Sequence, residues 1–354
     1  MKITSTEVAK RLGISRSTVS RALSGYPYVD DELRKRVLAT ATEMGYRPNH
    51  AAQSLAKGET LLIGFIIYTK PELYWERVLR GVKIAGDMLH DYDVVIETVI
   101  TDITKPQEQV EAMRALVKKG AKAIVLSPSA PNVVAGTIDE MMQQGIPIVL
   151  LNTDVPQSSR LCCVGSDYVQ AGRLAGELLS RFLMGRGKIA SIVFDDSGTM
   201  TPQKLTGFRE EISHFPHVEM LGPYMFSRTG EDVYDKTCEL LHTTQPNAIF
   251  MTYGQVEDVA RAIEDTGLAG LVPLVGYDAT EDSLTLLRRR VISALISQEP
   301  EQQAILCIRI LHDYLARCVR PKSSIIHARL DVITSQNSIY YRKDALSASN
   351  YYYI

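Results

Sequence analysis

The N-terminal segment has hydrophobic residues at helical spacing in three short stretches before residue 46. Thr4 and Glu7 have the spacing of a capping box, Gly13 can end the first helix, and Ser15 and Asp30 can cap the next two. The positions expected to face inward are Val8, Ala9, Leu12, Val19, Ala22, Leu23, Leu33, Val37, Leu38, Ala41 and Met44. Two helices joined by a short turn that contains glycine are typical of a helix-turn-helix, although spacing alone equally allows any small three-helix bundle.

From residue 61 the pattern changes to short apolar stretches that alternate with amphipathic ones. The apolar stretches predict buried strands at residues 61–68, 93–100, 121–128, 146–152, 188–196, 218–223, 248–253 and 271–278. The amphipathic stretches predict helices at residues 75–89, 107–118, 132–144, 167–183, 203–213, 232–241 and 255–265. Repeated strand–helix units predict an α/β fold of doubly wound parallel sheets, in two lobes separated by a cleft. Ligands bind such sheets at the carboxyl ends of the strands.

The composition and charge agree with a head and a body of different character. The chain has 354 residues, of which 45% are hydrophobic and 23% charged, enough for two or three domains of about 150 residues each. The formal net charge is −2, but residues 1–60 carry ten basic and six acidic side chains, so the remainder is acidic in balance. A basic head on an acidic body indicates that the head binds a polyanion.

The cysteines and the start of the chain indicate a cytoplasmic protein. Five cysteines with no CxxC pair favour reduced thiols over disulfides or a zinc site. The N-terminus has no apolar run of signal-peptide length, and stretches such as residues 61–68 are too short to span a membrane. The enzyme motifs HExxH, GxSxG and GxxxxGK[ST] do not occur. We therefore expect no catalytic residues, no metal and no cofactor.

A contiguous set of motifs covers residues 4–65. It comprises VAKRLGIS, STVSRALSG, RKRV, MGYRPNHAAQSLA and LLIGF, and the body adds VGSDYVQAGRLAGELL, LVGYDATEDS, ISQEP and DVITSQNS. This set strongly resembles the lactose-repressor (LacI/GalR) family of transcription regulators. The resemblance implies an all-α helix-turn-helix head, a hinge helix and a two-lobed sensor similar to periplasmic binding proteins. It further implies a cytoplasmic homodimer that represses transcription at a pseudo-palindromic operator and responds to a small sugar-like effector.

The resemblance also implies where the domains begin and end. The expected parts are a DNA-binding head at residues 1–46, a hinge at 47–60, a sensor at 61–342 and a tail at 343–354. Chains of this family cross between the lobes three times. Residues 61–165 and 296–325 would therefore form the lobe near DNA, and residues 166–295 and 326–342 the distal one. The tail has no leucine heptads, so a coiled-coil tetramer is not expected.

The second helix of the head is the expected base-reading element, because in a helix-turn-helix this helix enters the major groove. The resemblance assigns base contacts to Arg16, Ser17 and Arg21, and arginine can make two hydrogen bonds to guanine. The alternative for the arginines is a solvated or phosphate-binding role. Contacts to the DNA backbone are expected from Thr4, Ser15, Thr18 and Ser20, which can otherwise cap helices.

A short helix at residues 50–57, capped by Asn49, resembles the hinge helix of the family. In that family, a pair of hinge helices enters the minor groove and a leucine inserts between base steps. The matching leucine is Leu55, and Ala51 and Ala52 are small enough for a close approach to the groove. The alternative is a linker helix whose leucine packs on the body. So short a helix is marginal alone in water, so its folding can be coupled to DNA and dimer contact.

Three polar residues at strand ends and crossovers are the expected hydroxyl-binding groups of the sensor. Asp278, at the end of LVGYD, matches a hydroxyl-binding aspartate, although a lone acid there more often caps a turn. Gln298 in ISQEP matches a glutamine that contacts sugars in related binding proteins. Asn152 in VLLNTD matches a position that often holds aspartate. Such carboxylates and amides, together with aromatic faces, suit a polyhydroxylated ligand.

One cation and three aromatic residues complete the expected effector site. Lys204 stands where many family members have arginine, and it cannot form the planar contact of a guanidinium with two oxygens. Sugar acids and phosphates therefore remain possible effectors beside neutral sugars. Tyr74 and Trp75 can supply a stacking face, although Trp75 could equally belong to the core of its lobe. Tyr253 stands near a position where members of the family frequently have asparagine.

Two other classes of protein compete with the regulator. A periplasmic-type solute-binding protein would share the body, but the complete head and the missing signal peptide argue against it. An enzyme of the sugar-handling α/β type is the third class, and turnover of any sugar would support it. The sequence favours the regulator, with operator DNA, a small effector and a second copy of the chain as its partners.

Overall fold

The computed structural model describes residues 5–23, 28–44, 60–68, 72–194, 200–226 and 232–341. The chain divides into two compact units, Met1–Thr60 with Asp91–Asp93, and Leu61–His90 with Val94–Ile354. The first unit is called the head and the second the sensor. Several predicted site residues lie outside the described residues, namely Thr4, Asn49, Ala51, Ala52 and Leu55.

The head contains three helices, α1 (Ser5–Leu12), α2 (Arg16–Leu23) and α3 (Asp31–Glu43). Their common core is made of Val8, Ala9, Val19, Ala22, Val37 and Ala41. Two predicted caps are present. The Asp30 carboxylate accepts hydrogen bonds from the amides of Glu32 and Leu33 at 3.1 Å, and the Ser15 hydroxyl accepts one from the Thr18 amide at 3.0 Å. The inward prediction is wrong for Leu38, which is 47% exposed because it lies about 100° around α3 from the buried Val37.

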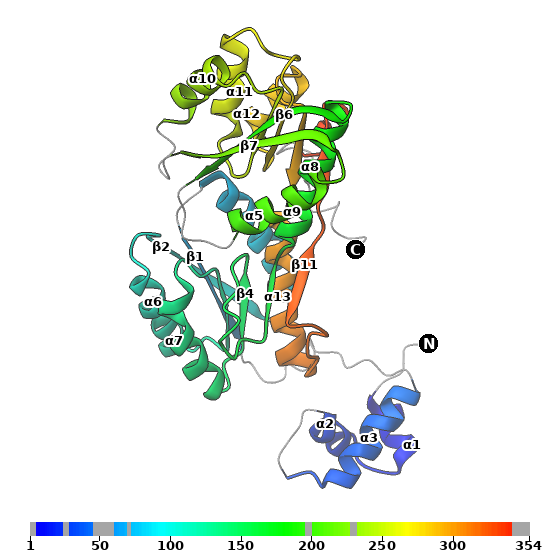
Figure 1. The fold of residues 1–354 in the computed structure, drawn as a ribbon. Helices are drawn as coiled ribbons and strands as arrows, with labels where there is room; N and C mark the ends of the chain where they lie inside the picture. The colour runs from blue at the N-terminus through cyan, green and yellow to red at the C-terminus, as the bar shows by residue number, and fades with distance from the viewer. Residues whose placement is uncertain are drawn as a thin grey trace. The chain divides into compact units, whose positions relative to one another are not determined.

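The first sheet of the sensor has six parallel strands in the order β11-β5-β4-β3-β1-β2. The strands are β1 (Leu61–Tyr68), β2 (Val94–Thr101), β3 (Ala123–Leu126), β4 (Ile148–Leu151), β5 (Cys162–Ser166) and β11 (Ile325–Ala328). Helices α6 (Gln107–Lys118) and α7 (Pro131–Gln143) cover one face, and α5 (Glu72–Leu89) and α13 (Pro300–Arg317) the other (Figure 1). The short helix η1 (His90–Tyr92) follows α5. This sheet and its helices are called the first lobe.

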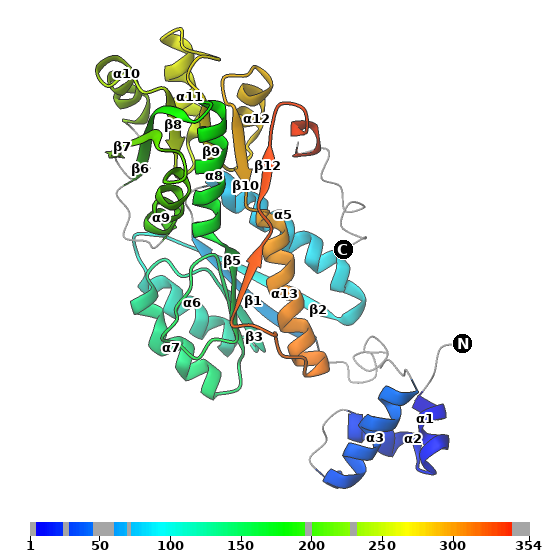
Figure 2. The same cartoon turned by 45° about the vertical axis from the view of Figure 1, so that its right-hand side comes forward.

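The second sheet has the order β12-β10-β9-β8-β6-β7, and its strands are parallel except for β12, which runs antiparallel to β10. The strands are β6 (Arg186–Phe194), β7 (His217–Phe226), β8 (Ala248–Met251), β9 (Leu274–Tyr277), β10 (Ala294–Ser297) and β12 (Asp331–Ile333). Its helices are α8 (Tyr168–Phe182), α9 (Met200–Ile212), α10 (Val233–Thr243), α11 (Val256–Asp265), α12 (Glu281–Arg288) and η2 (Ser338–Tyr341). This sheet and its helices are called the second lobe (Figure 2).

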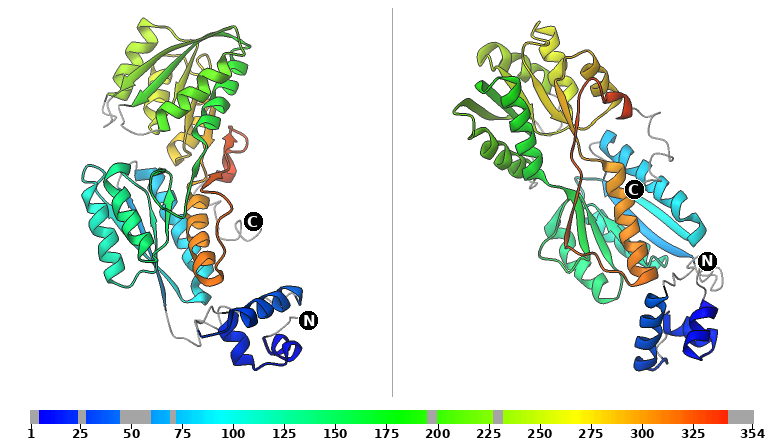
Figure 3. Two further views of the ribbon diagram at one scale, coloured as in Figure 1. Left: turned by 60° about the horizontal axis from the view of Figure 1, so that its bottom comes forward. Right: turned by 90° about the vertical axis from the view of Figure 1, so that its right-hand side faces the viewer.

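The chain crosses between the lobes after β5, after β10 and after β11. Figure 3 shows the last crossover as a continuous extended segment that leads from β11 into β12. Two of the lobe boundaries implied by the family resemblance are displaced. β10 belongs wholly to the second sheet and β11 wholly to the first, so the chain crosses near residues 298 and 329 instead of 296 and 326. The reason is that a four-residue apolar strand carries no signal of which sheet it joins.

Candidate functional site

A pocket lies between the lobes, at the carboxyl ends of strands from both sheets. This inter-lobe pocket is lined by Tyr68, Tyr74, Trp75, Asn152, Met200, Lys204, Tyr253, Gly254, Asp278 and Gln298. All seven residues that the sequence analysis proposed for the effector site are among them. They come together because parallel strands end at one edge of each sheet, and the two edges face the same space.

Asp278 follows β9 and is held by Gln298 from the second crossover. The Gln298 amide nitrogen donates a hydrogen bond of 3.0 Å to the Asp278 carboxylate. Burial raises the pKa of the Asp278 carboxyl, while the charges of Lys204 and Arg77 and the bond from Gln298 act in the opposite direction. The carboxylate is half-buried and retains acceptor capacity toward the pocket.

Lys204 lies on α9 and is only 2% exposed. Its ammonium group donates a 2.8 Å hydrogen bond to the carbonyl oxygen of Thr252 and stands 3.5 Å from the centroid of the Tyr277 ring. The Tyr168 ring centroid is 5.6 Å away. The ammonium is thus solvated by a carbonyl and an aromatic face of the protein itself, which is a cation–π arrangement.

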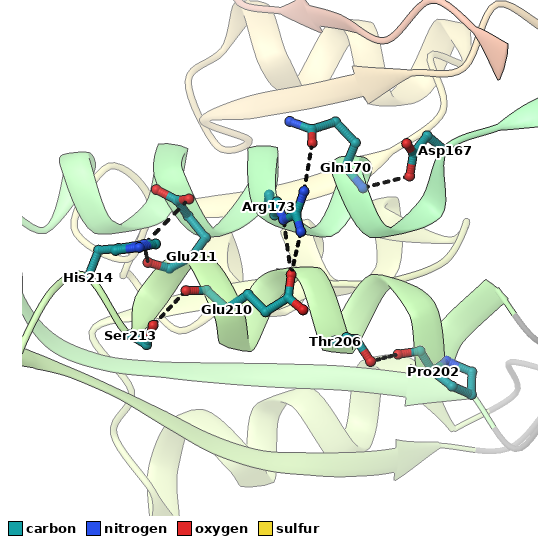
Figure 4. A network of polar contacts seen from close by, with 9 residues as sticks. All are labelled: Asp167, Gln170, Arg173, Pro202, Thr206, Glu210, Glu211, Ser213 and His214. Carbon is teal, nitrogen blue, oxygen red and sulfur yellow. Dashed lines mark hydrogen bonds and ion pairs between the residues drawn. The ribbon is translucent and has the colours of Figure 1, made fainter.

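The position of Lys204 depends on close packing of α8 against α9. A Cβ atom on Gly172 would lie 1.9 Å from the carbonyl oxygen of Lys204, and one on Gly207 would lie 1.8 Å from that of Val169. A side chain at either glycine would therefore require the two helices to move apart. Elsewhere along the same pair of helices, Arg173 donates to the Glu210 carboxylate at 2.7 and 3.0 Å (Figure 4).

Aromatic side chains form one wall of the pocket. The Trp75 ring makes edge contacts with Tyr68 and Tyr74, with centroids 4.8 and 5.0 Å apart, and is 3% exposed. Trp75 therefore packs in the lobe and lines the pocket at the same time. The Tyr74 hydroxyl is buried and has no hydrogen-bond partner among the residues that the structure describes. Burial and the nearby charge of Asp278 raise the pKa of Tyr74, so the hydroxyl keeps its proton as a donor.

Asn152 and Tyr253 occupy the two remaining predicted positions. The Tyr168 hydroxyl, at the start of α8, donates to the side-chain oxygen of Asn152 and lies 3.2 Å from its carbonyl oxygen. Part of the hydrogen-bonding capacity of Asn152 is therefore used to tie the first crossover to β4. The Tyr253 ring makes an edge contact of 5.4 Å with Phe194.

An ion pair next to the pocket was not predicted from the sequence. Arg77 on α5 donates to both carboxylate oxygens of Glu301 on α13, at 2.7 and 2.8 Å, and Glu301 is 2% exposed. A further Arg77 nitrogen lies 3.4 Å from the carbonyl oxygen of Ala279, beside Asp278 in the second lobe. No local pattern could reveal this pair, because its members are 224 positions apart.

The head presents a polar surface on α2. Arg16, Ser17 and Arg21 are exposed, whereas Thr18 and Ser20 are half-buried. The Ser15 hydroxyl bonds to those of Ser17 and Thr18 at 2.7 and 2.8 Å, so the start of α2 is held by a small hydroxyl network. Exposed arginines beside helix-terminal hydroxyls and amides can bind base edges and phosphates.

Comparison with known proteins assigns both parts of the chain. Residues 4–49 match the family model "Bacterial regulatory proteins, lacI family", and residues 63–317 match the model "Periplasmic binding protein domain". The chain belongs to the lacI family of regulators. It therefore combines a lacI-type DNA-binding head with a sensor of the periplasmic-binding-protein fold, and it is a DNA-binding transcription regulator.

Relatives of this lacI-family chain include the catabolite control protein A of Priestia megaterium, 25% identical over 89% of this chain and 93% of that protein. The sucrose operon repressor of Streptococcus mutans is 24% identical over 78% of this chain and 82% of that protein. An ABC transporter periplasmic solute binding protein from Actinobacillus succinogenes, with bound D-allose, has the same fold as the sensor. Its TM-score is 0.72, with 18% identity over 80% of this chain and all of the other. Within the described residues, no helix has the length and apolar character needed to cross a membrane.

Proposed function

We propose that this lacI-family protein is a cytoplasmic, homodimeric repressor that acts by binding and not by catalysis. Its binding to an operator would be controlled by a small polyhydroxylated effector in the inter-lobe pocket. The observation that supports this most strongly is that one chain joins a head with exposed Arg16, Ser17 and Arg21 to a pocket between two lobes. A solute-binding protein has no use for such a head.

The chemistry of the pocket supports a sugar or sugar derivative. Asp278 can accept from hydroxyl groups, Gln298 and Asn152 can add amide contacts, and the Tyr74 hydroxyl can donate. Trp75 supplies an apolar face for the C–H surface of a ring. The solute binding protein of the same fold from Actinobacillus succinogenes holds D-allose, which fits this class of ligand.

On DNA, we expect α2 of each protomer to enter the major groove. Arg16, Ser17 and Arg21 would read base edges, while Ser15, Thr18 and Ser20, with Thr4, would position the head on phosphates. Two heads related by a dyad would bind a pseudo-palindrome. The hinge residues Asn49, Ala51, Ala52 and Leu55 would enter the minor groove, with Leu55 inserted between base steps.

The effector would act by changing the angle between the lobes. The pocket residues come from both lobes, which are joined by three crossovers. A ligand that contacts both lobes would favour one inter-lobe angle if the crossovers bend. That angle would set the relative position of the two protomers. The hinge helices would then fold in one arrangement and unfold in the other. The effector can do this only to the extent that it binds the two states with different affinity.

A two-step screen tests the proposal. The full chain would be heated with a panel of sugars, polyols and their phosphates, and compounds that raise Tm would be added to a gel shift on DNA selected from a random pool. We expect at least one polyhydroxylated compound to raise Tm and to change affinity for the selected DNA. The Glu210→Gln variant loses an exposed carboxylate on α9 outside the pocket and serves as the control. It should respond to the same compounds as the wild type. Failure to enrich any DNA sequence, or stabilising sugars that leave DNA affinity unchanged at saturation, would contradict the regulator.

A further inference from the structure

Among the described residues that line the inter-lobe pocket, the formal charges balance. Of its described lining residues, Lys204 and Asp278 carry the formal charges, one of each sign. Whether an effector can be anionic therefore depends on whether a cation near the pocket has unused capacity for a second negative charge. Two cations act on Asp278, namely Lys204 and Arg77.

The Lys204 ammonium is engaged by the protein. It donates to the Thr252 carbonyl oxygen at 2.8 Å, lies 3.5 Å from the centre of the Tyr277 ring, and belongs to a side chain that is 2% exposed. Its backbone is also fixed, because the carbonyl of Lys204 is packed against Gly172. Turning the ammonium toward a bound phosphate would cost the carbonyl bond and the aromatic contact.

The Arg77 guanidinium is engaged as well. Two of its nitrogens bind the two carboxylate oxygens of Glu301 at 2.7 and 2.8 Å, and a third lies 3.4 Å from the Ala279 carbonyl oxygen. The pair is buried, and Arg80 lies 3.7 Å from the same carboxylate. Turning Arg77 toward a ligand would therefore break its two hydrogen bonds with the buried Glu301 carboxylate.

From this arrangement, we propose that the effector is a neutral polyol or sugar and that the pocket rejects its phosphorylated and carboxylated forms. The inference rests on the proposed function, which it narrows to one charge class. A phosphate or carboxylate in the pocket would place a second negative charge near Asp278, with Lys204 and Arg77 already bound within the protein. Neutral hydroxyl groups face no such penalty, since Asp278 can accept from them and the buried Tyr74 hydroxyl, which has no partner among the described residues, can donate.

Matched pairs of probes test the charge class. Calorimetry on the full chain would compare D-ribose with ribose 5-phosphate, and D-glucose with glucose 6-phosphate and gluconate, and would include D-allose. We expect the neutral member of a pair to bind more tightly by on the order of ten- to a hundredfold, the size expected for repulsion between like charges in a partly desolvated site. An anionic member that binds more tightly than its neutral partner would overturn the inference and leave the proposed function standing. Absence of binding by every probe would instead contradict the sugar-binding part of the proposed function.

Two variants test the physical cause. Asp278→Asn removes the negative charge but keeps a residue type that tolerates the local backbone. It should weaken binding of the neutral sugar and lower the ratio of neutral-sugar affinity to sugar-phosphate affinity by about tenfold or more. Lys204→Met should shift the ratio in the opposite direction. Glu210→Gln removes an exposed carboxylate elsewhere on α9 and should leave the ratio unchanged. A ratio that stays at its wild-type value in both pocket variants would show that charge balance does not set the selectivity.

Discussion

Asp278 and Asn152 share an unusual backbone conformation as well as a place in the pocket. Each follows a buried strand, and their φ angles are 65° and 69°. Among residues with a side chain, asparagine and aspartate adopt this left-handed region most readily. The residue type at each position thus ends a strand with a sharp change of direction and points a polar side chain at the strand end, which is where a ligand meets the sheet.

At the same scale, Arg16 and Arg21 should contribute to sequence recognition and not only to affinity. Replacing either with alanine should relax the preference at one symmetric base pair by about 1–3 kcal/mol, because a bidentate contact with guanine is lost. The slope of log affinity against log salt concentration should become less steep by no more than about one, the value for one lost phosphate contact. Binding selection from a random DNA pool measures the preference, with Lys35→Ala, an exposed cation on α3 outside the reading helix, as a control that should keep the wild-type preference. A wild-type sequence preference in both arginine variants would argue against base reading.

The pocket residues could be predicted from sequence because they match positions of the family that the chain resembles, and two of those positions also follow a rule of the fold. Asp278 and Asn152 stand directly after apolar stretches, and the carboxyl ends of parallel strands are where such sheets bind ligands. The engagement of Lys204 with Tyr277 and Thr252 could not be predicted, since it depends on how α9 is placed over β8 and β9. The same holds for Arg77 and Glu301, whose pairing is purely tertiary.

At the scale of elements, the contact between α8 and α9 is the closest helix pairing near the pocket. Three glycines, Gly172, Gly176 and Gly207, let the helix backbones approach so closely that a Cβ at Gly172 or Gly207 would overlap a carbonyl oxygen. Glycine within a helix is unfavourable by itself, by about 1 kcal/mol relative to alanine. Its use here indicates that packing, and not helix propensity, fixes α9 and with it Lys204.

Gly172→Ala should therefore lower the free energy of unfolding of the sensor by about 1–3 kcal/mol or more, because the added methyl group overlaps the Lys204 carbonyl. Gly136→Ala on α7 is the matched control. No atom lies within 4 Å of the position of its Cβ, so this variant should gain about 0.5–1 kcal/mol from helix propensity. Urea unfolding followed by circular dichroism gives both values. Equal effects of the two substitutions would refute the role of the glycine contact.

The strands that the hydrophobic pattern did not predict are short or unusual in composition. β5 has the sequence CCVGS, which lacks alternation and has a single β-branched residue, and β10 has only four residues. The helix that follows the second crossover, α13, could have been predicted from the sequence. α13 begins with Pro300 at its first turn, and Ala304, Ile305, Ile308 and Leu311 recur at helical spacing. β11 could not be assigned to a sheet, because its partner β5 lies about 160 residues earlier.

On the scale of the whole sensor, the crossovers are linked to one another. Arg329, between β11 and β12, lies 3.0 Å from the carboxylates of both Glu299 in the second crossover and Asp331 in β12. The Asp331 carboxylate also accepts from the Tyr341 hydroxyl at 3.0 Å. Because the Arg329 side chain is largely exposed, these ion pairs are weak, and they allow the lobes to change their angle at little cost. Under the proposed function, a ligand in the pocket would then need only a few kcal/mol of differential binding to control that angle.

If the pocket controls DNA binding in this way, Asp278→Ala should separate the two activities. The residue lies in the sensor, so affinity for the selected operator without effector should stay within about twofold of wild type. Effector affinity should fall by roughly ten- to a hundredfold, because a hydrogen bond to a charged group is lost. In a gel shift, the response should disappear at the concentration that saturates the wild type and return at a correspondingly higher concentration. Since alanine is strained at a φ of 65°, by about 1–2 kcal/mol, Asp278→Asn is measured beside it to separate strain from lost contact. A wild-type dose response in both variants would mean that the effector binds elsewhere.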